Sequence, residues 1–97
     1  MSREEGLAKL AEYRRLIDSV DRHLLELLNE RTAIAEQIGR VKQDLSMPIY
    51  EPRREEQVFH NVASNNRGPL PDEAVRRVFE RIIDEMRQVQ RLRILEK

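Results

Sequence analysis

Four ionisable side chains stand on a helical seam where apolar residues are expected, and their types suit anion binding. Between residues 7 and 45, positions spaced alternately three and four apart are mostly Leu, Ile or Ala, but Arg14, Asp21, Arg31 and Lys42 interrupt the series. Three of the four are cations, and a buried charge is costly unless it is paired. The surplus predicts a cavity for a ligand with at least two negative charges.

The two residue types would divide the work of holding such a ligand. The guanidinium groups of Arg14 and Arg31 suit bidentate binding of a carboxylate or phosphate, and the Lys42 ammonium suits a single oxygen. Taken singly, each cation is better explained as a snorkelling side chain or as a register-setting residue of a coiled coil. We interpret Asp21 in that way, but the three cations together indicate a site.

The remaining polar residues narrow the chemistry. The stretch PIYEPRREEQVF, residues 48–59, offers carboxylates that can accept from a ligand hydroxyl, and Gln90 lies in line with an apolar stripe near the C-terminal end. The chain has no cysteine, no serine placed beside a histidine, no metal-ligand spacing and no glycine-rich loop. Such a set can position an anion and stabilise developing charge, so it suits a reaction whose bonds rearrange within the substrate.

A very long first helix must position the seam. From about Arg3 to Leu45 the chain has no proline and only two glycines. A helix of about 40 residues is roughly 60 Å long, whereas a compact domain of this size has a radius of gyration of about 12–13 Å. The helix therefore needs a partner along its length, and we infer an intertwined homodimer.

Prolines and a glycine mark the other helix boundaries. Pro48 predicts the end of the first helix, and Pro52 predicts the start of a second that runs to about Asn66. Gly68 is interpreted as the left-handed cap residue of that helix, and Asp72 lies at the start of a third. The predicted apolar stripe of the third helix comprises Val75, Val78, Phe79, Ile82, Ile83, Met86 and Val89.

The composition fits one all-α domain over residues 1–97. The chain is 37% charged with three glycines and four prolines, which favours long helices. Its 18 basic and 18 acidic residues cancel, so nothing marks it as a nucleic-acid binder. No stretch approaches the roughly 20 apolar residues of a membrane span, and the first residues show no secretory signal pattern. We therefore expect no membrane partner and a cytoplasmic location.

Together these residues resemble the all-helical (AroQ-class) chorismate mutases. The resemblance covers residues 10–95 and rests on YRRLIDSVDRHLLELLNER (13–31), IGRVK (38–42), PIYEPRREE (48–56) and VFERIIDEMRQVQ (78–90). It implies a single chorismate mutase type II domain of three helices, in a domain-swapped homodimer with two equivalent sites. The implied reaction is the intramolecular Claisen rearrangement of chorismate, a dianion, to prephenate in phenylalanine and tyrosine biosynthesis, without a cofactor or metal.

The resemblance also assigns roles to the site residues. Arg31 resembles the family arginine that clamps a substrate carboxylate from the same chain, and Arg14 resembles the one that reaches in from the partner chain. Lys42 and Gln90 resemble the pair that donates to the ether oxygen, where negative charge grows as the C–O bond breaks. Glu55 resembles the carboxylate that accepts from the ring hydroxyl.

Three further positions are implied to bind substrate. Arg54 and Glu51 flank the hydroxyl-binding glutamate, and Glu51 stands where the family often has Asp. Met86 stands where the family often has Ser or Thr near a substrate carboxylate, so we expect somewhat weaker binding there, or a methionine that fills the wall of the site.

Two other readings of the sequence stay open. Isochorismate-pyruvate lyase has a similar fold and Arg/Lys clamp, although Lys42, Glu55 and Gln90 with an acid at Glu51 favour the mutase. A non-catalytic helical dimerisation or regulatory module would explain the seam but would have no reason to keep Lys42 and Gln90 in line. Both a free enzyme and one domain of a longer fusion protein fit, because in the family this domain is often fused to other enzymes of the pathway.

Overall fold

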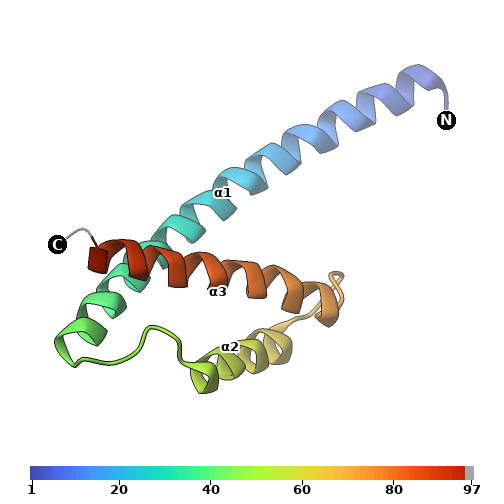
Figure 1. Ribbon diagram of the computed structural model, residues 1–97. Coiled ribbons are helices and arrows are strands. Elements are labelled where there is room, and N and C mark those ends of the chain that lie inside the picture. Colours follow the sequence, from blue (N-terminus) through green and yellow to red (C-terminus); the bar gives the residue numbers. More distant parts are fainter. Residues whose placement is uncertain (96–97) are drawn as a thin grey trace. The chain divides into compact units, whose positions relative to one another are not determined.

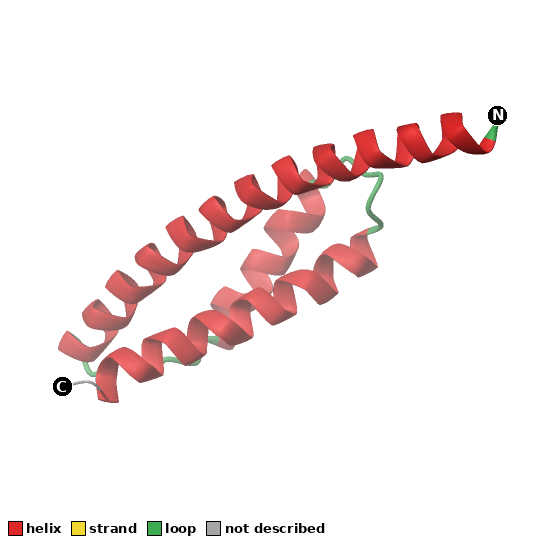
Figure 2. Ribbon diagram, turned by 90° about the horizontal axis from the view of Figure 1, so that it is seen from above, coloured by secondary structure: helices red, strands yellow, loops and turns green. Residues whose placement is uncertain are grey.

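The computed structural model describes residues 1–95, and their regular secondary structure is entirely helical (Figures 1 and 2). Helix α1 spans Arg3–Asp44, α2 spans Pro52–Asn65 and α3 spans Asp72–Leu95. The prediction of an all-α chain with three helices, one very long, is confirmed. Side chains from position 93 onward lie outside the described part of the chain. Among residues 1–95, no helix combines the length and the apolar character that a membrane crossing requires.

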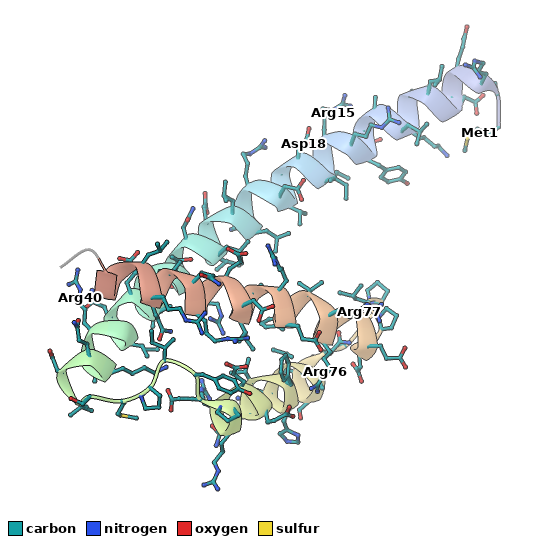
Figure 3. All side chains as sticks on the ribbon, in the orientation of Figure 1. Met1, Arg15, Asp18, Arg40, Arg76 and Arg77 are labelled. Atoms are coloured by element: carbon teal, nitrogen blue, oxygen red, sulfur yellow. The ribbon has the colours of Figure 1, made fainter. Side chains whose placement is uncertain are left out.

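The first of two compact units, residues 1–31, is the N-terminal part of α1. Its side chains project on all sides of the helix, Arg15 and Asp18 among them (Figure 3). Most helical stability in proteins comes from packing an apolar face, and exposed apolar surface of this extent is typical of an interaction site. The exposed apolar side chains of this unit include Leu7, Leu10, Tyr13, Leu16, Ile17, Val20, Leu24, Leu25 and Leu27.

The second unit, residues 32–97, contains the end of α1 together with α2 and α3, and α2 packs against α3 (Figure 1). Its buried apolar side chains are few, and α2 contributes only half-buried ones. Of the predicted stripe of α3, Val75, Ile83 and Met86 are buried, whereas Val78 is 51% exposed. Among the described side chains of this unit, the buried apolar ones are Ala35, Val75, Ile83 and Met86.

A backbone hydrogen-bond motif sets the end of α1. The Met47 N–H donates to the Lys42 carbonyl over 2.7 Å, and the Ser46 N–H donates to the Gln43 carbonyl over 3.1 Å. Ser46 is left-handed, with φ 54°. These two bonds and the left-handed residue form a Schellman motif, which uses carbonyls that the helix end leaves unpaired. The chain therefore leaves α1 just before Pro48, the residue from which the sequence predicted the break.

An asparagine side chain organises the connection from α2 to α3. The Asn66 amide nitrogen donates to the Leu70 carbonyl over 2.8 Å and to the Asp72 carboxylate over 2.6 Å, and its oxygen accepts from the Gly68 N–H over 3.0 Å. Gly68 is left-handed as expected, with φ 70°. The interpretation of Gly68 as the cap residue of α2 is wrong, because Asn66 occupies that position in an extended conformation.

Charged and aromatic contacts brace α2 against α3. The Arg76 guanidinium lies 4.3 Å from the centre of the Phe59 ring and 3.3 Å from the Glu56 carboxylate, both on α2 (Figure 3). It also lies 3.3 Å from Glu80, one turn along α3. Exposed ion pairs and cation–π contacts of this kind contribute only about 0–1 kcal/mol each. These contacts join the middle of α2 to the first turns of α3.

Gly39 of α1 lies directly against Gln90 of α3. A Cβ atom at this buried position would lie 3.1 Å from Cγ and 3.3 Å from Cβ of Gln90. Carbon atoms in contact prefer separations of about 3.5–4.0 Å, so a side chain here would press on Gln90. The absence of a side chain at Gly39 is therefore what allows Gln90 to lie against α1.

Gly39→Ala should lower the free energy of unfolding by up to about 2 kcal/mol, because crowding costs about 1–3 kcal/mol and the gain in helix propensity returns only about 1 kcal/mol. Gln90 cannot yield cheaply, since it is buried and hydrogen bonded to Lys42. Urea denaturation measures the change. Gly6→Ala is the matched control, because its Cβ would meet only the flexible Met1 side chain at 3.4 Å. A Gly39→Ala protein more stable than wild type would contradict the crowding.

Candidate active site

The Lys42 ammonium is the centre of a polar cluster in the second unit. The residue is 6% exposed, and its Nζ donates to the Ile49 carbonyl over 2.7 Å and to the Gln90 Oε1 over 3.2 Å. It also lies 2.9 Å from the Glu51 carboxylate. An ammonium has three N–H donors, so these three oxygens match its full capacity. A buried Lys42 was expected to be paired, and its partners are two residues of the loop after α1 and one residue of α3.

Local structure explains how this cluster forms. Lys42 is in the last turn of α1, where a cation is favoured by the negative end of the helix dipole. The turn after α1 then brings Ile49 and Glu51 back to it. Glu51 is the N-cap residue of α2, but its side chain makes no capping hydrogen bond and pairs with Lys42 instead. Pro52 needs no cap on its own nitrogen, because proline has no N–H to satisfy.

The amide of Gln90 is oriented by Lys42. Gln90 is 7% exposed, and its Oε1 accepts from the Lys42 ammonium. With the oxygen engaged in this way, the amide nitrogen faces away from Lys42 and carries two N–H donors. The structure thus brings together two of the predicted catalytic residues and gives each a hydrogen-bond donor in the same part of the molecule.

Glu55 lies in the first turn of α2 and contacts an arginine that the sequence analysis did not single out. Its Oε2 is 3.2 Å from Nε of Arg87 on α3. The Arg87 guanidinium also pairs with Asp84 and lies 5.4 Å from the centre of the Tyr50 ring. One signal was available in the sequence: Arg87 precedes Gln90 by three positions, and residues three apart share a helix face.

Met86 is buried on α3, where its sulfur accepts a weak hydrogen bond from the Thr32 hydroxyl over 3.6 Å. Thr32 is a second residue that the sequence analysis missed. It places a hydroxyl group beside position 86, which is where the resemblance led us to expect one. Met86 itself packs as an apolar wall.

Arg54, a predicted substrate-binding residue of the second unit, is not brought to this cluster. Arg54 is exposed and donates to the Gln57 side chain on its own helix over 3.4 Å. Arg14 and Arg31 lie in the first unit, both on α1, where Arg14 is exposed and Arg31 is half-buried. A rise of about 1.5 Å per residue separates these two arginines by about 26 Å along the helix axis.

The arrangement can carry out one kind of chemistry. A buried ammonium and an adjacent amide stabilise an oxygen that gains negative charge, because fixed donors need no rearrangement during the reaction. The Glu55 carboxylate can accept from a hydroxyl group of the same ligand. Within the part of the chain that the structure describes, no group of three or more acidic or histidine side chains is placed to hold a metal ion.

Comparison with known sequences identifies similar proteins. The family model described as chorismate mutase type II matches residues 13–91. A bifunctional chorismate mutase/prephenate dehydratase of Neisseria gonorrhoeae is 40% identical over 82 residues, which cover 84% of this chain and 22% of that protein. The chorismate mutase of Methanocaldococcus jannaschii is 29% identical over 86 residues, covering 88% of this chain and 87% of that one. The chain thus spans about a fifth of the gonococcal relative.

Comparison with solved structures gives the same result. The chorismate mutase of Helicobacter pylori, solved in complex with prephenate, superposes with a TM-score of 0.86 at 28% sequence identity. The superposition covers 93% of this chain and 98% of that one. The similarity therefore extends over all three helices.

Replacing Lys42 by the neutral and similarly shaped methionine should destabilise the fold by about 2–4 kcal/mol, because buried acceptors lose their donor and the Glu51 charge loses its partner. The loss stays below that of a fully buried pair, since Glu51 is 36% exposed and reaches water. Chemical denaturation measures it. The control is Arg81→Met, which breaks an exposed pair with Glu85 and should cost less than about 1 kcal/mol. Equal effects of the two substitutions would contradict the central place of Lys42.

Proposed function

We propose, from the premise that this chain belongs to the chorismate mutase type II family, that it converts chorismate to prephenate. The observation that carries the proposal is the hydrogen bond between the buried Lys42 ammonium and the Gln90 amide. The prephenate bound by the Helicobacter pylori chorismate mutase supports the choice of ligand. The residues of this chain supply the donors that such a reaction requires.

For this rearrangement the protein needs only to orient the substrate and to stabilise the charge that develops on it. One C–O bond breaks and one C–C bond forms within the same molecule, so no proton, electron or leaving group is exchanged with a side chain. Negative charge grows on the ether oxygen as its bond to carbon breaks. Lys42 and Gln90 donate to that oxygen, and removing a fixed donor of this kind typically costs about 10²–10³ in rate.

Glu51 must give way when Lys42 donates to substrate. The three N–H groups of Lys42 face Ile49, Glu51 and Gln90. Of these three partners, Glu51 is the one whose charged side chain reaches water, so exchanging it for a substrate oxygen leaves no buried group unpaired. Glu51 then acts as the group that keeps the ammonium paired until substrate takes its place.

Other residues bind the hydroxyl group and one carboxylate of the substrate. Glu55 accepts from the ring hydroxyl, as the resemblance implies. The Thr32 hydroxyl, which lies beside Met86, donates to a substrate carboxylate in place of the Ser or Thr that the family often has at position 86. Arg54 reaches the ligand only if it leaves Gln57, which an exposed side chain can do at little cost.

The carboxylate clamps come from two copies of the chain. Arg14 and Arg31 of one copy are about 26 Å apart along α1, too far to grip one small dianion jointly. We propose a domain-swapped homodimer with two equivalent sites, in which Arg31 acts in its own chain and Arg14 acts across the interface. One site then contains both arginines without bending α1.

Two adjacent apolar rows on α1 support this assembly. Leu10, Ile17 and Leu24 recur every seven residues, and so do Tyr13, Val20 and Leu27 beside them; all six are exposed. A coiled-coil seam needs only a narrow stripe, whereas a helix packed among several others needs a wider one. The two rows alternate three and four residues apart and so form such a narrow seam, which supports packing against a helix of a second copy.

The test of the proposed function is turnover of chorismate to prephenate by the purified chain. Lys42→Ala should lose at least about 10² in kcat. Lys9→Ala, which removes an exposed lysine of α1, is the control and should keep activity. Isochorismate is assayed alongside, since release of pyruvate from it would indicate the lyase instead. A chain that dimerises but acts on neither compound would instead support the non-catalytic dimerisation or regulatory module.

Mixing two inactive variants should restore activity if sites are shared between chains. Arg14→Ala and Arg31→Ala homodimers should each be nearly inactive. After refolding together, random pairing in a two-fold dimer makes half the dimers mixed, each with one intact site, so activity should approach about a quarter of wild type. Arg15→Ala, which removes the neighbouring exposed arginine, is the control for the substitution itself. Proven chain exchange without recovery would refute the shared site.

Gln90→Glu should make the rate depend on pH. The new carboxylate can still accept from Lys42, but it cannot donate to the ether oxygen unless it is protonated. An unperturbed Glu has a pKa of about 4.3, so the variant should be poor near pH 8 and recover as pH falls through the pKa of the new group. Wild type should show no rise on acidification. The control is the exposed neighbour Gln88→Glu. If kcat of Gln90→Glu and kcat of wild type depend on pH in the same way, Gln90 is not a catalytic residue.

A further inference from the structure

We infer that Arg87 is a positioning residue: it holds the Glu55 carboxylate in place and offsets its charge beside the dianionic substrate. The inference rests on the proposed function, which gives Glu55 the substrate hydroxyl. Arg87 was not among the residues that the resemblance assigns to the site. Its contact with Glu55 comes from the packing of α3 against α2.

The contact between Arg87 and Glu55 is close and largely shielded from water. Nε of Arg87 lies 3.2 Å from Oε2 of Glu55, and the two side chains are 26% and 18% exposed. The Nε atom is buried and forms no well-directed hydrogen bond. The contact is therefore mainly one of charge, and it engages one carboxylate oxygen, which leaves the carboxylate capacity to accept a ligand hydroxyl.

The guanidinium is itself held on two sides. It pairs with the Asp84 carboxylate on its own helix, three positions earlier, and lies 5.4 Å from the centre of the Tyr50 ring. Tyr50 stands between Ile49 and Glu51, the two loop residues that contact Lys42. The same short loop thus adjoins both Lys42 and the Arg87–Glu55 pair, so displacement of one would disturb the other.

The charge of Glu55 explains why it needs a cation. A carboxylate that accepts from the hydroxyl of a dianion lies near two like charges, and like charges at short range in a shielded site repel strongly. Arg87 offsets that repulsion through its contact with Glu55, while its guanidinium also pairs with Asp84. Loss of Arg87 should therefore weaken substrate binding more than it slows the chemical step.

The chain offers a matched control one glutamate further along α2. Arg76 also lies on α3, pairs with Glu56 on α2 and stacks over an aromatic ring, that of Phe59. It braces the same two helices, but its pair is well exposed. If Arg87 served only to hold α2 against α3, then Arg76→Gln and Arg87→Gln would have similar effects on catalysis.

The experiment measures KM and kcat for chorismate in Arg87→Gln, Glu55→Gln and the double variant, with Arg76→Gln and Glu56→Gln as controls. Arg87→Gln should raise KM roughly tenfold, a typical scale for coupled charged neighbours, and change kcat less. In the Glu55→Gln background the further loss of Arg87 should add little, because no carboxylate is left to hold. Arg87→Lys keeps the positive charge and should recover part of the loss in KM. Thermal melting confirms that each variant is folded.

Two outcomes would overturn the inference alone. One is a KM for Arg87→Gln equal to that of Arg76→Gln, which would reduce Arg87 to a brace. The other is a double variant whose losses multiply, which would mean that Arg87 acts on the substrate independently of Glu55. A wild-type chain that does not turn over chorismate would instead overturn the proposed function, and this inference with it.

Discussion

The buried ammonium of Lys42 is the constraint that organises the second unit. A cation that is 6% exposed must be fully paired, and its three oxygen partners come from the loop after α1 and from α3. One side chain thus connects the end of α1, this loop and α3. The same requirement prepares the chemistry, because the oxygens that satisfy Lys42 also hold its donors and the Gln90 amide in fixed directions.

Backbone geometry makes that pairing possible. The left-handed Ser46 turns the chain back after α1, so that Ile49 can reach Lys42. Gly39, one turn before Lys42, has no side chain to keep Gln90 at a distance. Stability and site geometry are therefore coupled here: a substitution that filled the space at Gly39 would act on Gln90 first and on the Lys42 contact through it.

The sequence predicted what is local and missed what depends on neighbours. Helix starts follow from prolines, caps and periodicity, so the three helices and the inward positions of Lys42, Met86 and Gln90 could be read directly. Spacing within one helix does not report which side chain of another helix it meets. Arg87 and the partner of Glu51 were missed for that reason. Gly68 was misplaced because the cap of α2 lies two residues earlier, at Asn66, whose backbone N–H donates to the Ala63 carbonyl.

The charge balance of the second unit bears on the role of the cations on the α1 seam. Lys42 is paired with Glu51, and Arg87 is paired with Glu55 and Asp84, so these two cations are largely neutralised by carboxylates of their own unit. On the proposed function, the dianionic substrate replaces Glu51 as a partner of Lys42. The substrate still requires further positive charge. Arg14 and Arg31 are the seam residues that can supply it, and their separation along one helix means that a single chain cannot supply both to one ligand. With the proposed homodimer, the surplus of cations on the seam and the exposed apolar face of α1 have one explanation, a site completed by a second copy.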